Sequence, residues 1–185
     1  MKNRLKKIIK NILGIKNPHS LEELLKNGLK VGSNFNLQND CIIDSSHCWH
    51  IEIGDNVTFA PRVHILAHDA STYNYLGYTK VLNTRIGSNV FVGAGSIIMP
   101  GCNINDNVII GAGAVVTKNI PENSVYAGNP AKFICHTDDY ISIQKNKMLS
   151  TKCFKSNYTI NSNISSEMKE EMITAIENNG QCFVQ

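Results

Sequence analysis

Histidine and aspartate side chains gather in one short segment near the middle of the sequence. Residues 64–70 read His-Ile-Leu-Ala-His-Asp-Ala, so His64 and His68 stand four residues apart and Asp69 follows directly. A neutral imidazole accepts a proton near pH 7 and is the natural general base for activating a hydroxyl group. The chain has six histidines, which all compete for this role: His19, His47, His50, His64, His68 and His136. The choice among them depends on the elements that carry them.

Those elements repeat every six residues. Between residues 86 and 121 each hexad begins with a branched apolar residue: Ile86, Val92, Ile98, Ile104, Ile110 and Val116. The fifth position of each hexad is apolar or small. A fixed short period is typical of a solenoid, in which each unit buries its apolar side by stacking on its neighbours. A hexad is long enough for one short strand and one turn, so the repeat predicts a parallel β-helix with the branched residues inside.

The repeat extends upstream with two interruptions. Three hexads cover residues 53–70, and three weaker ones cover residues 31–48. Residues 49–52 break the phase, and residues 71–85 separate the upstream hexads from the strong run. Three hexads make one triangular coil, which predicts about four coils and a partial fifth. A long loop inside a compact domain is more often functional than idle, so the insertion 71–85 is expected on the binding face.

The hexad positions distinguish the histidines. His68 is the fourth residue of its hexad, where the repeat turns, so its ring is expected to face outward beside the insertion. His64 lies between two inward residues and is also expected to face outward, one strand earlier. His19 and His136 lie outside the coils and are expected to be surface residues. An active-site imidazole usually has a partner that fixes its tautomer; Asp69 is expected to point elsewhere, whereas Asp44, one coil earlier, is able to approach.

Composition places the chain among cytoplasmic globular proteins. It has 185 residues, 42% of them hydrophobic, and a net charge of +3, which is too small to indicate nucleic-acid binding. No apolar run approaches the roughly 20 residues of a membrane span, and lysines interrupt the apolar residues at the N-terminus, unlike a secretory signal. The six cysteines show no Cys-x-x-Cys spacing, which argues against a disulfide framework and a zinc ribbon. We expect a cytoplasmic protein, at most peripheral to the inner membrane.

Helical segments are predicted on both sides of the repeat, so we divide the chain into residues 1–30, 31–134 and 135–185. The first segment contains a basic amphipathic helix, which is able to lie on an anionic membrane but is favoured to pack on its own protein. A capping box at Ser20 and Glu23 then opens a short helix that ends near Gly28. The C-terminal tail is predicted to be partly helical, with one amphipathic helix closed by Gly180.

The sequence resembles a known family. The hexads, followed by Val-Val-Thr-Lys-Asn-Ile-Pro (115–121) and Ala-Gly-Asn-Pro-Ala-Lys (127–132), are similar to those of the hexapeptide-repeat acyltransferases. The likeness is greatest to galactoside, maltose and xenobiotic O-acetyltransferases and to relatives that acetylate capsule or lipopolysaccharide sugars. It implies a left-handed parallel β-helix, although parallel crossovers are otherwise right-handed. It also implies a homotrimer that transfers an acetyl group directly from acetyl-CoA to a sugar hydroxyl, without a metal.

The same resemblance assigns roles to individual residues. His68 occupies the position of the catalytic base. The backbone at Gly93-Ala94 and Gly111-Ala112 corresponds to the oxyanion and pantetheine contacts, where small residues let a ligand approach closely. Thr117 and Lys118 match a coenzyme-binding element, and Lys132 matches the basic residue that meets the nucleotide phosphates. The residues expected on the acceptor side are Asp40, Asp44, Asp69 and Tyr78.

Two other functions fit part of the pattern. A γ-class carbonic anhydrase-like zinc enzyme has the same β-helix and needs three histidines from two subunits. His64 and His68 would supply two of them, but no histidine occurs from residue 69 to residue 135, which counts against zinc. A non-catalytic β-helix for assembly or binding is the third possibility. Because residues 1–30 leave no room for a nucleotide-binding domain, a sugar hydroxyl is favoured over an amine as the acceptor.

Overall fold

The computed structural model describes residues 20–185, so the basic helix predicted near the N-terminus lies outside the described residues. The chain forms two compact units, Met1–Thr137 and Asp138–Gln185. The boundary falls three residues later than predicted, because β16 (Lys132–His136) still pairs with the strand before it. The first described helix, α2 (Leu21–Lys26), begins as expected with Ser20 Oγ accepting a hydrogen bond from Glu23 N–H at 3.2 Å.

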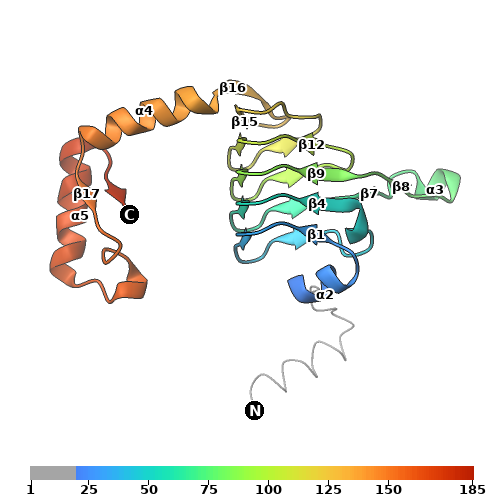
Figure 1. The fold of residues 1–185 in the computed structure, drawn as a ribbon, viewed down its shortest axis with the longest axis horizontal. Coiled ribbons are helices and arrows are strands. Elements are labelled where there is room, and N and C mark those ends of the chain that lie inside the picture. The colour runs from blue at the N-terminus through green and yellow to red at the C-terminus, as the bar shows by residue number, and fades with distance from the viewer. Residues whose placement is uncertain (1–19) are drawn as a thin grey trace, which may run out of the picture. The chain divides into compact units, whose positions relative to one another are not determined.

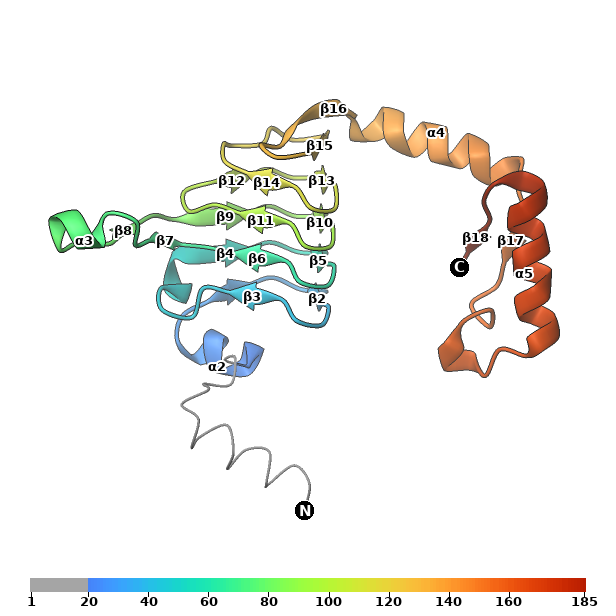
Figure 2. The same cartoon turned by 180° about the vertical axis from the view of Figure 1, so that it is seen from behind.

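Short parallel strands build the first unit and visit three sheets in rotation (Figures 1 and 2). The first sheet contains β1 (Lys30–Val31), β4 (Ile51–Ile53), β9 (Thr84–Ile86) and β12 (Asn103–Ile104). The second sheet contains β2 (Asn36–Leu37), β5 (Thr58–Phe59), β10 (Phe91–Val92), β13 (Ile109–Ile110), β15 (Ser124–Ala127) and the antiparallel β16. The third sheet contains β3 (Ile42–Ile43), β6 (His64–Ile65), β11 (Ile97–Ile98) and β14 (Val115–Val116). We call three successive strands, one from each sheet, a coil.

The strand register follows the hexads. A regular coil is 18 residues long, as in the pairing of Ile86 with Ile104. The pairing of Val31 with Ile53 spans 22 residues, four more than a regular coil. The pairing of Ile53 with Ile86 spans 33 residues, 15 more. Both excesses leave the stack between a strand of the third sheet and the next strand of the first sheet, and we call this edge the variable corner.

The predicted inward positions form the core. The six leading residues of the strong hexads are 1% exposed or less, and so are the leading residues of the two hexads at Phe59 and Ile65. Branched side chains fit this arrangement because short extended strands stack them directly above one another. Leu24 of α2 belongs to the same core, and Cys48 of the 3-10 helix η1 (Cys48–His50) is fully buried there.

Asparagines support another corner of the stack. Asn34, Asn56, Asn89 and Asn107 all adopt the left-handed conformation, with φ between 54° and 57°. Their side-chain amides form a ladder of hydrogen bonds from coil to coil, 2.9–3.2 Å long. Beside the ladder, Asp55 Oδ1 accepts the N–H of Ser33 in the coil below at 2.6 Å. Asparagine suits these turns because it tolerates positive φ and bonds to an identical neighbour.

The long insertion forms an arm with its own secondary structure (Figure 2). β7 (His68–Asp69) pairs antiparallel with β8 (Lys80–Val81), and α3 (Tyr73–Leu76) lies between them. The predicted end of the insertion at residue 85 is wrong, because β9 already begins at Thr84. Thr84 is buried and its hydroxyl donates to the Leu66 carbonyl at 2.7 Å, which fixes this residue in the stack.

The second unit is largely helical. It contains α4 (Thr137–Leu149), β17 (Cys153–Phe154), the 3-10 helix η2 (Ile160–Ser162), α5 (Ser166–Asn179) and β18 (Phe183–Val184). Helix α5 is the predicted tail helix, and it ends at Gly180 with φ of 74°. Helix α4 was not predicted, because none of its side chains is buried and its sequence has no apolar stripe. No helix in residues 20–185 is long and apolar enough to cross a bilayer.

Candidate active site

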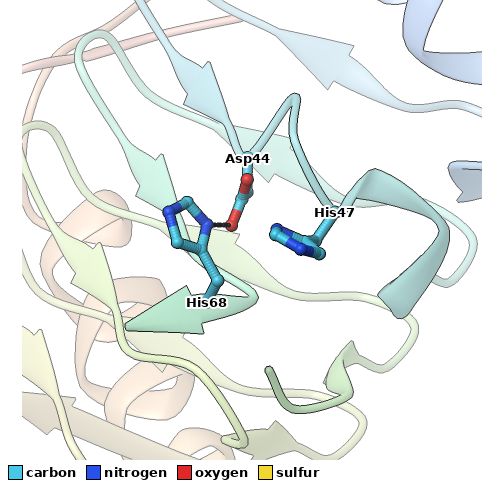
Figure 3. Close-up of side chains that lie close together, drawn as sticks. All are labelled: Asp44, His47 and His68. Carbon is cyan, nitrogen blue, oxygen red and sulfur yellow. Dashed lines mark hydrogen bonds and ion pairs between the residues drawn. The ribbon is translucent and has the colours of Figure 1, made fainter. Parts of the chain in front are cut away.

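Asp44 and His68 meet at the variable corner. Asp44 directly follows β3, and His68 lies in β7 just after β6, so the two residues occupy adjacent coils. His68 Nδ1 forms a hydrogen bond with Asp44 Oδ2 (Figure 3). An ionised carboxylate only accepts, so the imidazole donates from Nδ1 and its lone pair lies on Nε2. The hydrogen bond holds the imidazole in one tautomer and one orientation, an arrangement that is chemically able to accept a proton at Nε2.

Asp44 is held ionised by its surroundings. The residue is only 4% exposed, and its carboxylate also accepts the N–H groups of Ala67 at 3.0 Å and Ser46 at 3.1 Å. Burial alone raises the pKa of the Asp44 carboxyl, but the hydrogen bonds from Ala67 and His68 outweigh it and hold that pKa below its ordinary value. The negative charge therefore remains available to stabilise a protonated imidazole.

His47 is a neighbour that the sequence analysis did not single out. Its ring centroid lies 5.0 Å from that of His68 (Figure 3). His47 Nδ1 is buried without a hydrogen-bond partner among the described residues. Ligand atoms of Asp44, His47 and His68 all lie within 4.8 Å of one another. The sequence signal that could have identified His47 was the phase break at residues 49–52. These four extra residues lengthen the same corner that carries His68.

His64 lies away from this group. It belongs to β6 in the third sheet, in register between Ile42 and Ile97. Among residues 20–185, the close group of potential metal ligands consists of Asp44, His47 and His68 and does not include His64. The histidine pair anticipated for a zinc enzyme, His64 with His68, is therefore not brought together within this chain.

The other predicted acceptor residues are dispersed. Asp69 Oδ1 accepts the N–H of Ser71 at 2.9 Å, and Asp69 Oδ2 lies 3.9 Å from Lys80 Nζ. Its side chain is thus engaged away from His68, as expected. Tyr78 is 78% exposed on the arm. Asp40 is an exposed turn residue with φ of 61° between β2 and β3, so it lies at a different corner from His68.

Close packing between coils also requires small residues at the predicted coenzyme glycines. A Cβ on Gly93 would lie 2.4 Å from Ala112 N, and a Cβ on Gly111 would lie 2.8 Å from Ala127 Cβ. Close packing between coils therefore requires glycine at both positions, whether or not a ligand approaches. The N–H groups of both glycines are already used, donating to Ile110 O and Tyr126 O at 2.8 Å.

The remaining coenzyme candidates are accessible side chains. Thr117, Lys118 and Lys132 are all exposed. Thr117 and Asp69 line one small pocket of about 200 Å³, together with Lys80, Met99 and Pro100. A residue predicted for the coenzyme and a residue predicted for the acceptor thus share one hollow at the foot of the arm.

Known proteins resemble a large part of this sequence. Residues 83–118 match the bacterial transferase hexapeptide family, described as six repeats. Protein CapG of Staphylococcus aureus is 40% identical over 126 residues, which cover 65% of this chain and 73% of CapG. Galactoside O-acetyltransferase of Escherichia coli (strain K12) is 39% identical over 110 residues, which cover 58% of this chain and 51% of that enzyme. The chain matches only about half the length of the galactoside enzyme.

Solved structures agree with these sequence matches. A maltose O-acetyltransferase from Clostridium difficile 630 is 49% identical, covers 57% of each chain and superposes with a TM-score of 0.51. A hexapeptide-repeat acetyltransferase from Vibrio cholerae is 20% identical, with a TM-score of 0.52 over 58% of this chain. The second similarity concerns the fold alone.

Proposed function

The chain belongs to the hexapeptide-repeat acyltransferase family, and from this premise we propose that it transfers an acetyl group from acetyl-CoA to a hydroxyl of a saccharide. One observation carries the proposal beyond family membership: a buried, ionised Asp44 orients His68 at the edge of the stack. An oriented neutral imidazole beside an accessible surface is what proton removal from a hydroxyl requires.

The reaction proceeds by direct attack. The acceptor oxygen adds to the thioester carbonyl carbon while its proton passes to His68 Nε2. The imidazolium that forms is stabilised by the Asp44 carboxylate at Nδ1. When the tetrahedral intermediate collapses, the carbon–sulfur bond breaks and the imidazolium returns the proton to the departing sulfur. The products are the acetyl ester and free coenzyme A.

A backbone N–H is proposed to stabilise the oxyanion of this intermediate. The N–H of Ala94 makes no hydrogen bond within residues 20–185, unlike that of Gly93. Of these two residues, Ala94 therefore has the N–H that can bind an oxyanion. The oxyanion would form either on the same subunit or across a cleft on a neighbouring subunit. No acyl-enzyme is required, and burial raises the pKa of the Cys102 thiol, which disfavours a thiolate nucleophile there.

The acceptor class is inferred from the relatives. The galactoside and maltose enzymes act on sugar hydroxyls, as their names state, and both are similar to this chain at 39% identity or more over the matched residues. Lys118 and Lys132 are proposed to bind the coenzyme phosphates, since both are exposed cations near the C-terminal end of the stack. Asp69 and Thr117, which share a pocket, are proposed to lie where acceptor and coenzyme meet.

The finer features of fold and assembly are proposed on the same footing. We take the stack to be a left-handed parallel β-helix, because the family has this handedness. We also propose a homotrimer, and its support is the apolar arm: Tyr75 is 87% exposed, Leu76 65% and Tyr78 78%. Such a cluster suits a subunit contact better than water. All six cysteines are free, which is compatible with a cytoplasmic enzyme.

A zinc enzyme is less well supported by this site. Asp44, His47 and His68 supply a possible ligand set. Zinc binding by Asp44 would, however, compete with the hydrogen bond that now joins Asp44 to His68. A non-catalytic role would not account for the hydrogen bond by which the buried Asp44 carboxylate orients His68.

An assay of free-coenzyme release tests the proposal. Purified protein is incubated with acetyl-CoA and a panel of sugars, amino acids and nucleotide sugars, with metal content measured in parallel. Release of coenzyme A that depends on a saccharide, and that survives a chelator, supports an acetyltransferase. Coenzyme release that responds only to amino acids, or activity that disappears with the chelator, would overturn it.

A further inference from the structure

A polar pocket adjoins the variable corner on the outer face of the first sheet. Its volume is about 280 Å³. Its floor consists of outward-facing residues of β1, β4 and β9, which the strand register aligns: Lys30 with Glu52, and Glu52 with Arg85. Its wall comes from the two loops of the variable corner and contains Trp49, His50 and Asn83. None of these residues was assigned a role by the sequence analysis or by the proposed mechanism.

A row of rings connects this pocket with the proposed base. The centroids of His68 and His47 are 5.0 Å apart, those of His47 and Trp49 are 5.5 Å apart, and those of Trp49 and His50 are 5.8 Å apart. We call these four rings the ring track. It begins at the proposed base, and its last two rings, Trp49 and His50, line the pocket, so only the ring of His47 separates His68 from a pocket residue.

The pocket combines an aromatic face with fixed polar groups. Trp49 is 53% exposed, which leaves much of its indole uncovered. Arg85 donates to Glu52 at 3.0 Å, and His50 Nδ1 lies 2.7 Å from Asn83 Oδ1. An indole packs against the C–H face of a sugar ring, while guanidinium, carboxylate and amide groups bond its hydroxyls in fixed directions.

Two features are not explained by stability alone. The Arg85–Glu52 pair is solvent-exposed, and such pairs contribute little to folding. Along the track, His47 Nδ1 is buried and lacks a hydrogen-bond partner among the described residues. A buried polar atom without a partner is unfavourable for folding, so stability does not explain this one.

We propose that this pocket is an extended acceptor site and that the acceptor is an oligosaccharide of at least two sugar units, an inference that rests on the proposed acetyltransferase activity. The reacting unit lies at His68, and the next unit lies over His47 and Trp49. Hydroxyl groups of that second unit bond to Arg85 and Glu52. The ring centroids from His68 through His47 to Trp49 are 5.0 and 5.5 Å apart, so the second unit extends from the neighbourhood of His68 toward the indole.

Binding of sugars of increasing length tests the proposal. The probes are three uncharged series, each a monosaccharide methyl glycoside with its disaccharide and trisaccharide: glucose, galactose and N-acetylglucosamine. Isothermal titration is run on the wild-type protein in the presence of coenzyme A. In at least one series, the disaccharide should bind about tenfold or more tightly than the monosaccharide, because it gains the indole face and the Arg85 fork.

Variants of pocket residues test whether the tighter binding of the disaccharide arises in this pocket. Trp49→Ala and Arg85→Gln should each remove most of the tenfold gain and leave monosaccharide binding unchanged. Trp49→Phe retains a ring and should keep a part of it. The matched control is Ile42→Ala, which truncates an exposed apolar residue on the outer face of the third sheet and should change neither affinity. Circular dichroism confirms that each variant is folded.

The outcomes separate this proposal from the proposed function. If no series shows tighter binding with length, or if the gain survives Trp49→Ala and Arg85→Gln, the extended site is wrong even when acetyl transfer is observed. If sugars bind with the expected length dependence but no coenzyme A is released, the extended site stands and the acetyltransferase assignment fails.

Discussion

Asp44 and His68 lie 24 residues apart in the sequence, yet they share a hydrogen bond, because the chain passes the same corner of the stack twice. The remaining partners of the Asp44 carboxylate are backbone N–H groups, which fix it in place. The imidazole is thereby oriented by a carboxylate that the backbone of the stack holds rigidly in place.

Replacing the carboxylate should therefore damage catalysis more than binding. Asp44→Asn removes the charge that stabilises the imidazolium and should lower kcat by about 100-fold or more, with a small change in the acceptor KM. Steady-state kinetics on the acceptor identified by the coenzyme-release assay measure both constants. Asp55→Asn, a carboxamide substitution at another corner, is the control and should leave kcat within a few-fold. Equal losses in both variants would remove Asp44 from the mechanism.

Replacing the base itself should abolish nearly all turnover. His68→Ala is expected to lower kcat by roughly 100- to 10,000-fold, the usual effect of losing a positioned base, while coenzyme binding persists. His64→Ala should cost only a few-fold, because His64 lies on the outer face of the third sheet and outside the group around His68. A kcat for His68→Ala close to that of the parent would leave His47 and His50 as the residues to test.

Two lysines should contribute charge to coenzyme binding. The double variant Lys118→Ala, Lys132→Ala should raise the Kd for coenzyme A by about tenfold or more at low salt, since each cation can bond a phosphate. The difference should shrink at 1 M salt, where charge attraction is screened. Isothermal titration at two salt concentrations measures this. An unchanged Kd at low salt would show that the phosphates bind elsewhere.

The apolar arm should mediate assembly. Light scattering is expected to give three times the chain mass for the wild-type protein. Tyr75→Ser combined with Leu76→Ser should shift the population toward smaller species, because both side chains are largely exposed in the single chain and do not support its core. A fully active monomer at assay concentration would refute the trimer and, with it, a site shared between subunits.

Acid should weaken a contact between coils. The hydrogen bond from Ser33 N–H lowers the pKa of Asp55 below its ordinary 3.8. A lowered pKa in the folded state means that this group stabilises the fold above pH 3.8 and that the stabilisation is lost as the pH falls through the folded value. Asp55→Asn should therefore lower the thermal midpoint at pH 7, and the difference from wild type should narrow below pH 3.8. A difference that stays constant across this range would contradict the assignment.

The hexads predicted most of the stack because its strand register depends only on the six-residue period and on the lengths of the two interruptions. Leading residues from Ile53 to Val116 are buried as expected, and the four-residue and fifteen-residue excesses match the two phase breaks. The family resemblance is confirmed as well. Helix α4 was missed, because its surface carries no apolar periodicity to detect.

The candidate site was predicted less completely. His68 was identified from its hexad and the resemblance, and the structure adds that Asp44 reaches it. His47 and Trp49 were not identified, because no periodic rule describes the path of a four-residue excess. Asp40 was predicted on the acceptor side together with Asp44, and the structure places its turn at another corner from His68. The glycines at 93 and 111 were interpreted only as places where a ligand approaches, and the sequence did not show that close packing against the neighbouring coil also requires them.

Both interruptions of the 18-residue register leave the stack at the same edge, one coil apart, and the strands resume the same inward pattern after each. Apart from the buried Asp44 and Cys48, the loops at this edge can therefore change in length and sequence without disturbing the side chains inside the stack. Exchanging residues 45–47 and 70–83 as a pair, with Asp44, Cys48 and the strands β3, β6 and β9 retained, would graft a different acceptor preference onto an unchanged scaffold. This edge is where the protein is open to redesign.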